Sequence, residues 1–88
     1  MPRITYYVVL PFIRSQDGDL LGVEAEEAPT ASAATLRAQS RVGRPIGDDT
    51  IIGAIAFSRS GDPQFGDFDD AVILARYGET PENVEGFD

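Results

Sequence analysis

Residues 3–14 read RITYYVVLPFIR, a run of β-branched and aromatic side chains that is typical of a β-strand. A strand that is apolar on both faces usually lies in the middle of a sheet and is covered on both sides. Residues 50–58, TIIGAIAFS, share this property and predict a second central strand. In the first run, one alternating set is Ile4, Tyr6, Val8, Leu10 and Phe12, and the other is Tyr7, Val9 and Ile13.

Two further strands flank these central ones. Residues 15–19, SQDGD, predict a hairpin turn in which Gly18 can adopt a positive φ. Residues 20–27 then alternate apolar and polar side chains, as expected of a half-exposed edge strand. A second turn at 60–64 precedes a last predicted strand at 67–77.

One helix is predicted between the two pairs of strands, over residues 31–42. Thr30 or Ser32 would cap its start, and Gly43 would end it, with Pro45 beyond. Leu36 points almost opposite to the predicted buried face. Small side chains let a helix lie close to a sheet, and the face consists mainly of them: Ala31, Ala34, Thr35, Ala38 and Val42.

This order of elements predicts an α+β fold, a ββαββ two-layer sandwich with one helix packed on a four-stranded antiparallel sheet. The two-sided hydrophobicity of the first and third strands places them in the centre, in the spatial order 2-1-3-4. We expect a single domain over residues 1–78. The acidic residues 79–88 would form either a loose tail or one helical turn that begins at Thr80 and Pro81.

The composition argues against most enzyme chemistry, because the 88 residues include no His, Cys or Lys. Without them there is no Ser-His-Asp or Cys-His relay, no Schiff base, and no set of soft ligands for zinc, haem or iron–sulfur clusters. We therefore expect a protein that is not an enzyme, with no catalytic, cofactor-binding or metal-binding residues and no cofactor. Carboxylate chemistry would need a cleft that a domain of this size rarely builds.

The charge balance bears on partners and location. With 15 acidic and 7 basic residues the net charge is −8, which opposes binding to nucleic acid or to anionic lipid. No stretch approaches the roughly 20 apolar residues of a membrane span, and no cleavage site follows the N-terminal strand. We expect a soluble, cytoplasmic protein that binds neither nucleic acid nor membrane.

One predicted helix of about 13 residues, roughly 20 Å long, can cover only one face of a four-stranded sheet. Tyr7, Val9 and Ile13 would then lie on the uncovered face, where they predict an interface with another protein or a second copy of the chain. The alternative is that residues 79–88 fold back over this face through Val84 and Phe87.

The helix supplies the other candidate partner-binding residues. Arg37, Arg41 and Arg44 form a basic stripe that could meet an acidic partner, beside the outward-pointing Leu36. The stripe is equally explained as a solvated helix flank, where cations are favoured near the helix C-terminus or pair with Glu24, Glu26 or Glu27. If it binds anything, the overall charge favours protein over RNA.

Two further groups of residues have simpler structural explanations. Asp62, Asp67, Asp69 and Asp70 could ligate a divalent cation, but their spacing does not match an EF-hand and suits a turn and a protected edge strand. The aromatic residues Tyr6, Tyr7 and Phe12 are similar in type to an RNA-stacking platform, yet no accompanying basic motif is present and core packing explains them.

Several segments resemble short uncharacterised bacterial proteins: TYYVVLPF, the Asp17-Gly18 turn, AFSRSGDP and GDFDDAVILARYG. This resemblance covers most of the chain and implies no activity. A looser similarity links residues 5–42 to HicB-type antitoxins, which pair a YYxVV-like strand with an Asp-Gly turn and a later helix. This chain lacks their Pro-Asp-x-Pro-Gly segment and their DNA-binding extension, so we interpret the similarity as a shared small-domain pattern rather than kinship.

The sequence therefore leaves two classes of function. The first is a small protein-binding module, homodimeric or with another partner, that uses the sheet face, the sheet edge or the arginine stripe. The second is a domain that binds a small ligand or a divalent cation through the carboxylates of the last hairpin.

Overall fold

The computed structural model describes residues 3–62 and 64–81. The predicted strand–strand–helix–strand–strand order is present, with the second and fourth predicted strands each divided in two and with a short extra hairpin after the helix. The elements are β1 (Ile4–Arg14), β2 (Leu20–Gly22), β3 (Glu26–Ala28), α1 (Ala31–Arg41), β4 (Pro45–Ile46), β5 (Asp49–Thr50), β6 (Gly53–Asp62), β7 (Asp67–Phe68) and β8 (Val72–Gly78).

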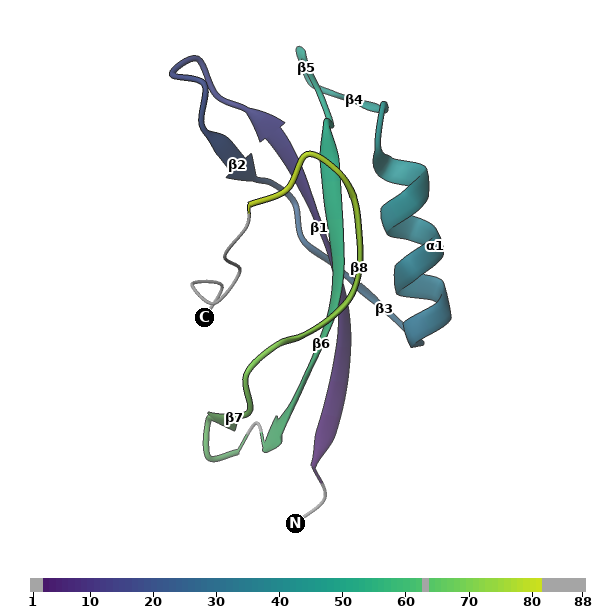
Figure 1. The fold of residues 1–88 in the computed structure, drawn as a ribbon. Coiled ribbons are helices and arrows are strands. Elements are labelled where there is room, and N and C mark those ends of the chain that lie inside the picture. Colours follow the sequence, from purple (N-terminus) through teal and green to yellow (C-terminus); the bar gives the residue numbers. More distant parts are fainter. Residues whose placement is uncertain (1–2, 63, 82–88) are drawn as a thin grey trace.

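The two long strands β1 and β6 form the centre of the main sheet. They are antiparallel and stay in register from the pair Ile4–Gly61 to the pair Phe12–Gly53. β2 and β3 follow one another along the outer edge of β1, and β7 and β8 do the same along β6. The predicted 2-1-3-4 order is thus confirmed as β2-β1-β6-β8, and Figure 1 shows the single helix on one side of this sheet.

The helix α1 begins and ends where the sequence indicates. The Thr30 side chain accepts a hydrogen bond from the Ala33 amide at 3.0 Å, so Thr30 rather than Ser32 is the N-cap. Beyond the C-terminus, Gly43 has a φ of 89°, and its amide donates to the Ile51 carbonyl at 2.8 Å. These bonds turn the chain from the helix towards β5 and β6.

Small side chains allow α1 to lie directly on the sheet. Ala34 and Ala38 of the helix are fully buried against Val9 of β1 and against Ala54 and Ala56 of β6. The predicted alanine-rich face is therefore the buried face of the helix. Because a close-packed core has little free volume, this layer has no room for larger side chains.

The opposite face of the sheet carries the larger side chains. Phe12, Ile55 and Phe57 form a second buried cluster, in which their exposed fractions are 1%, 0% and 7%. Both hairpin ends bend towards this face, away from the helix (Figure 1). Leu20 of β2 and Ala71, just before β8, pack against the cluster from these ends.

A β-bulge opposite Pro11 separates β2 from β3. Gly22 pairs with Phe12, and Glu26 pairs with Val9. The edge therefore advances by four residues while β1 advances by three, so the edge has one extra residue. Pro11 has no N–H to offer the edge strand, and only its carbonyl is used, by the Val23 amide at 2.9 Å. A proline inside a sheet is tolerated at such a bulge.

The bulge forces an unusual backbone conformation on Glu24. Its φ of 47° lies in the left-handed region, which among the described residues is otherwise occupied only by glycines. A non-glycine residue in this region costs of order 1 kcal/mol or more. The local strain is therefore tied directly to the missing N–H of Pro11.

The ends of the described chain add two observations. The Glu79 amide donates to the Ile52 carbonyl at 2.9 Å, and its side chain forms an ion pair with Arg14, so the chain remains attached to the sheet just past β8. Residues 82–88, which include Val84 and Phe87, lie outside the described residues. Within the described part of the chain, no helix has the length and apolar character needed to cross a membrane.

We predict that Ala38→Leu lowers the free energy of unfolding by about 1–3 kcal/mol, because the added side chain pushes α1 away from β6. Leu36→Ala, on the outer side of the same helix, should change it by less than about 0.5 kcal/mol. Urea unfolding followed by circular dichroism measures both. Equal stability of the Ala38→Leu variant and the parent would show that the helix does not lie as closely as described.

We also predict that Glu24→Gly is more stable than Glu24→Ala by up to about 1 kcal/mol, since glycine adopts the left-handed conformation without strain. The comparison with alanine removes the effect of the carboxylate. The backbone of Val23 is not in the left-handed region. At this position Val23→Gly should therefore be less stable than Val23→Ala, the order expected of extended backbone. The same order at both positions would contradict the strain at the bulge.

Candidate functional site

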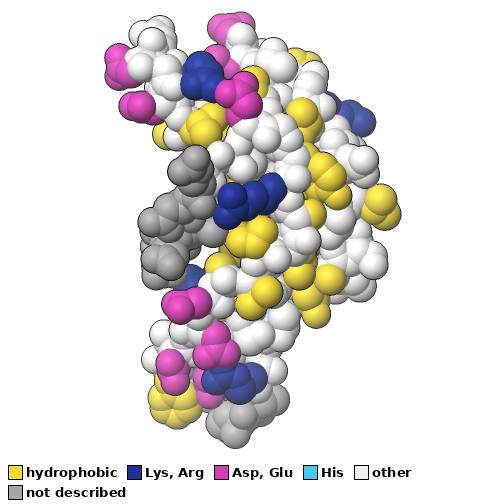
Figure 2. Space-filling view, viewed as in Figure 1, with side chains coloured by type: hydrophobic (Ala, Val, Ile, Leu, Met, Phe, Trp, Pro, Cys, Tyr) yellow, Lys and Arg dark blue, Asp and Glu magenta, His cyan; other side chains and the backbone are white. Residues whose placement is uncertain are grey.

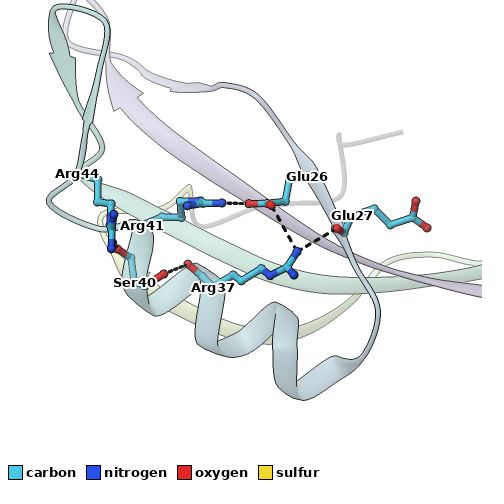
Figure 3. Close-up of polar contacts among 6 residues, drawn as sticks. All are labelled: Glu26, Glu27, Arg37, Ser40, Arg41 and Arg44. Atoms are coloured by element: carbon cyan, nitrogen blue, oxygen red, sulfur yellow. Dashed lines mark hydrogen bonds and ion pairs between the residues drawn. The ribbon is translucent and has the colours of Figure 1, made fainter.

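Two of the three arginines of the predicted stripe form their ion pairs within the subunit. Arg37 and Arg41 lie on the flank of α1 that faces β3, and both form ion pairs with Glu26, the Arg37 pair at 3.4 Å (Figure 3). Arg37 also donates to the backbone carbonyl of Glu27 at 3.4 Å. These contacts tie the helix to the edge strand and largely neutralise the stripe.

Arg44 differs from these two residues. Its Nε donates to the Ser40 carbonyl at 3.0 Å, at the C-terminal end of α1. Within residues 3–62 and 64–81 it forms no ion pair with a carboxylate. A cation here is favoured by the negative end of the helix dipole. Arg44 is thus the member of the stripe whose charge no carboxylate of the described residues neutralises.

A groove of about 370 Å³ lies beside this arginine. It opens between the bulge, the end of α1 and the β4–β5 hairpin. Two glutamates and two arginines line it, so its charges balance. The other four lining residues are apolar, two prolines and two isoleucines. The lining residues are Pro11, Glu24, Glu26, Arg41, Arg44, Pro45, Ile46 and Ile51.

The predicted position of the apolar partner-binding residues is wrong. Tyr7 and Val9 lie beneath α1, where Val9 is 0% exposed and Tyr7 packs against the same cluster. Ile13, on the same side of β1 by alternation, is half-buried. The physical reason is that Ala54 and Ala56 share this side of the sheet, and their small size is what admits the helix.

The face opposite the helix is also less open than the sequence predicts. Its middle, around Ile55, is buried, and Val8 and Leu10 are partly buried around it. The prediction of a broad open apolar face is therefore corrected. The alternative cover, residues 79–88 acting through Val84 and Phe87, falls mostly outside the described residues.

The remaining candidates are dispersed over the surface. Leu36 is 65% exposed on the outer side of α1, as its helical position predicts, and it borders a shallow depression with Arg37, Gln39 and Ser40. The aromatic residues do not form one stacking platform. Tyr6 contacts Phe68 with ring centroids 6.0 Å apart, Tyr7 lies on the other face, and Phe12 is buried.

The acidic residues of the last hairpin are used locally. Asp69 pairs with Arg3 at 2.6 Å, and Asp62 accepts a hydrogen bond from the Gln64 amide at 2.9 Å. Across the hairpin, Asp62 stands opposite Asp67. In the part of the chain that the structure describes, no group of three or more acidic residues is placed to hold a metal ion.

The two edges of the sheet differ in strand length and in charge, a difference that was not predicted from the sequence. One edge consists of two three-residue strands, β2 and β3, separated by the bulge and carrying Glu24, Glu26 and Glu27. The other edge is β8, seven residues long, preceded by Ala71 and uncharged from there to Ala75. Among the described residues, no strand pairs with its outer side.

Side-chain exposure adds to this contrast. Val72, at the start of β8, is 60% exposed. Figure 2 shows acidic side chains gathered at the two hairpin ends and hydrophobic ones along the middle of this view, over β8 and α1. The available signal in the sequence was the uncharged run AVILA at residues 71–75, in a strand that could be placed at the end of the sheet.

Comparison with known proteins adds no relative from which a function could be transferred. No protein-family model matches the chain, and neither a curated protein nor a solved structure is significantly similar to it.

We predict that Glu26→Gln lowers the free energy of unfolding by about 1 kcal/mol, because it removes the partner of both Arg37 and Arg41 at a partly exposed site. Glu27→Gln, whose backbone carbonyl rather than its side chain meets Arg37, should have little effect. Urea titrations at low and high NaCl would measure the difference, which should shrink in high salt. An equal loss in both variants would contradict the role assigned to the Glu26 carboxylate.

Proposed function

We propose that this protein is an interaction module that binds a partner protein by strand addition at the β8 edge. The observation that carries the proposal is the difference between the two sheet edges. An unpaired edge presents a row of backbone N–H and C=O groups, and an extended chain segment can pair with it as an additional strand.

The β2–β3 edge is poorly suited to this role. Its strands are three residues each, the bulge interrupts the row of backbone groups, and Glu24 and Glu27 would repel an acidic partner. Short strands, bulges and charge are the features by which natural proteins protect an edge from pairing.

The β8 edge carries these features only weakly: a register shift against Ala56 and Phe57 makes Leu74 an extra residue, and one charged residue, Arg76, lies near the end of the strand. The Glu79 amide donates to the Ile52 carbonyl, on the β6 side of the strand, so the sheet side of β8 is used up to its end. The run from Ala71 to Ala75 contains no charge and no proline. Backbone bonds would supply affinity, and exposed Val72 would supply an apolar contact.

A protein partner fits the charges better than the alternatives do. A net charge of −8 disfavours nucleic acid, and the pairing of Arg37 and Arg41 with Glu26 removes much of the basic surface. The second class of function, cation binding by the last hairpin, receives no support from the geometry. Asp69 already pairs with Arg3. Asp62 and Asp67 face each other across the hairpin, but two carboxylates alone are too few to hold a divalent cation.

We predict that Val72→Asp abolishes partner binding while leaving the fold intact, because a buried charge at the new strand pair would be desolvated without a partner. Leu36→Asp is the matched control, since Leu36 is 65% and Val72 60% exposed. The three proteins would serve as baits in lysate of the source cells, with bound proteins identified by mass spectrometry and folding checked by circular dichroism. A partner retained by Val72→Asp but lost by Leu36→Asp would overturn the proposal.

A further inference from the structure

We propose that the strand accepted at the β8 edge is β8 of a second copy, so that the protein forms a two-fold dimer with one continuous sheet. This inference rests on the strand-addition function and names its partner. In such a dimer the strand order would run β2-β1-β6-β8 and then through the second copy in reverse. Both helices would lie on the same face of the sheet, because the two-fold axis passes through it at the β8–β8 junction.

The charges along β8 favour antiparallel pairing of two copies. Asp70 directly precedes the uncharged run, next to the Asp69 that pairs with Arg3, and Arg76 follows the run. Antiparallel pairing about the middle of residues 71–75 brings the acidic end of each strand near the basic end of the other. Parallel pairing would instead bring like charges together, which is unfavourable at close range. The strand is thus complementary to its own antiparallel copy.

The other edge of the molecule makes this assembly a closed one. A head-to-tail contact would have to pair β8 with the bulged β2–β3 edge, where the strands are short and the register is broken at Glu24. Pairing of two β2–β3 edges would place their glutamates against each other. Pairing of β8 with β8 avoids both and leaves a protected edge at each end, so growth stops at two copies.

The mass in solution tests the inference directly. Size-exclusion chromatography with light scattering should give twice the 9.5 kDa chain mass for the parent and for Leu36→Asp. For Val72→Asp, we expect the dissociation constant to rise at least about tenfold, with the 9.5 kDa species dominant at micromolar concentration. A parent that stays at 9.5 kDa up to about 100 µM would overturn self-pairing.

A single introduced cysteine provides a second test that does not depend on the charged variant folding. The chain has no Cys, so Val72→Cys and Ile73→Cys each create a unique thiol in the run that would meet its own copy. Mild oxidation should cross-link Ile73→Cys fastest, because pairing about the middle of residues 71–75 places residue 73 directly opposite its own copy, and directly opposed residues have Cβ atoms about 4.5–5.5 Å apart. Val72→Cys would lie opposite Leu74 of the second copy and should cross-link more slowly. Leu36→Cys should remain uncross-linked. Equal rates at all three positions would contradict the β8 junction.

The outcomes separate this inference from the proposed function. A monomeric parent, together with a lysate partner that is lost only with Val72→Asp, would overturn self-pairing and keep strand addition. A dimer that persists in Val72→Asp and forms no cross-link through residues 72–73 would overturn self-pairing at β8, and a lysate partner that Val72→Asp also retains would overturn strand addition as well. A dimer that depends on Val72 and cross-links there would support both.

Discussion

The antiparallel pairing of β1 with β6 organises the whole sheet. Both strands are apolar on two faces, so burying one face is not enough to remove their side chains from water. The helix covers the side on which Val9, Ala54 and Ala56 lie, and the bent hairpin ends pack Leu20 and Ala71 against the side of Phe12 and Ile55. The strands β2, β3, β7 and β8 are attached to the edges of this pair, and α1 lies on one of its faces.

Size complementarity decides which face receives the helix. On β6 the alternating residues are small on one side, Ala54 and Ala56, and large on the other, Ile55 and Phe57. A helix whose inner face is alanine can approach only the small side of the sheet closely. This close approach is what fully buries Ala34 and Ala38. The same alternation leaves the larger side chains to fill the concave side, where the hairpin ends bend inwards (Figure 1).

Arg3, Arg14, Arg37 and Arg41 form ion pairs within the subunit, so a partner is more readily explained by the uncharged surface than by these cations. Glu26 binds two arginines, and Asp69 and Glu79 bind Arg3 and Arg14. Surface pairs of this kind add little stability individually, but they neutralise cations that a partner could otherwise recognise. The uncharged run at residues 71–75 of the β8 edge then stands out in a protein whose net charge is −8.

The α+β class, the two central strands, a helix N-cap at Thr30 or Ser32 and the alanine face of the helix could all be predicted from the sequence, because each depends on local propensity or on periodicity. The sequence also indicated Glu26 among the possible partners of the stripe and placed Leu36 outside. That Thr30 is the cap and that Val9 lies under the helix became clear from the folded chain alone, since both sides of β1 are apolar and alternation cannot tell them apart. The bulge at Glu24 and the contrast between the two edges likewise depend on which strands become neighbours, which is a property of the assembled sheet and not of any one segment.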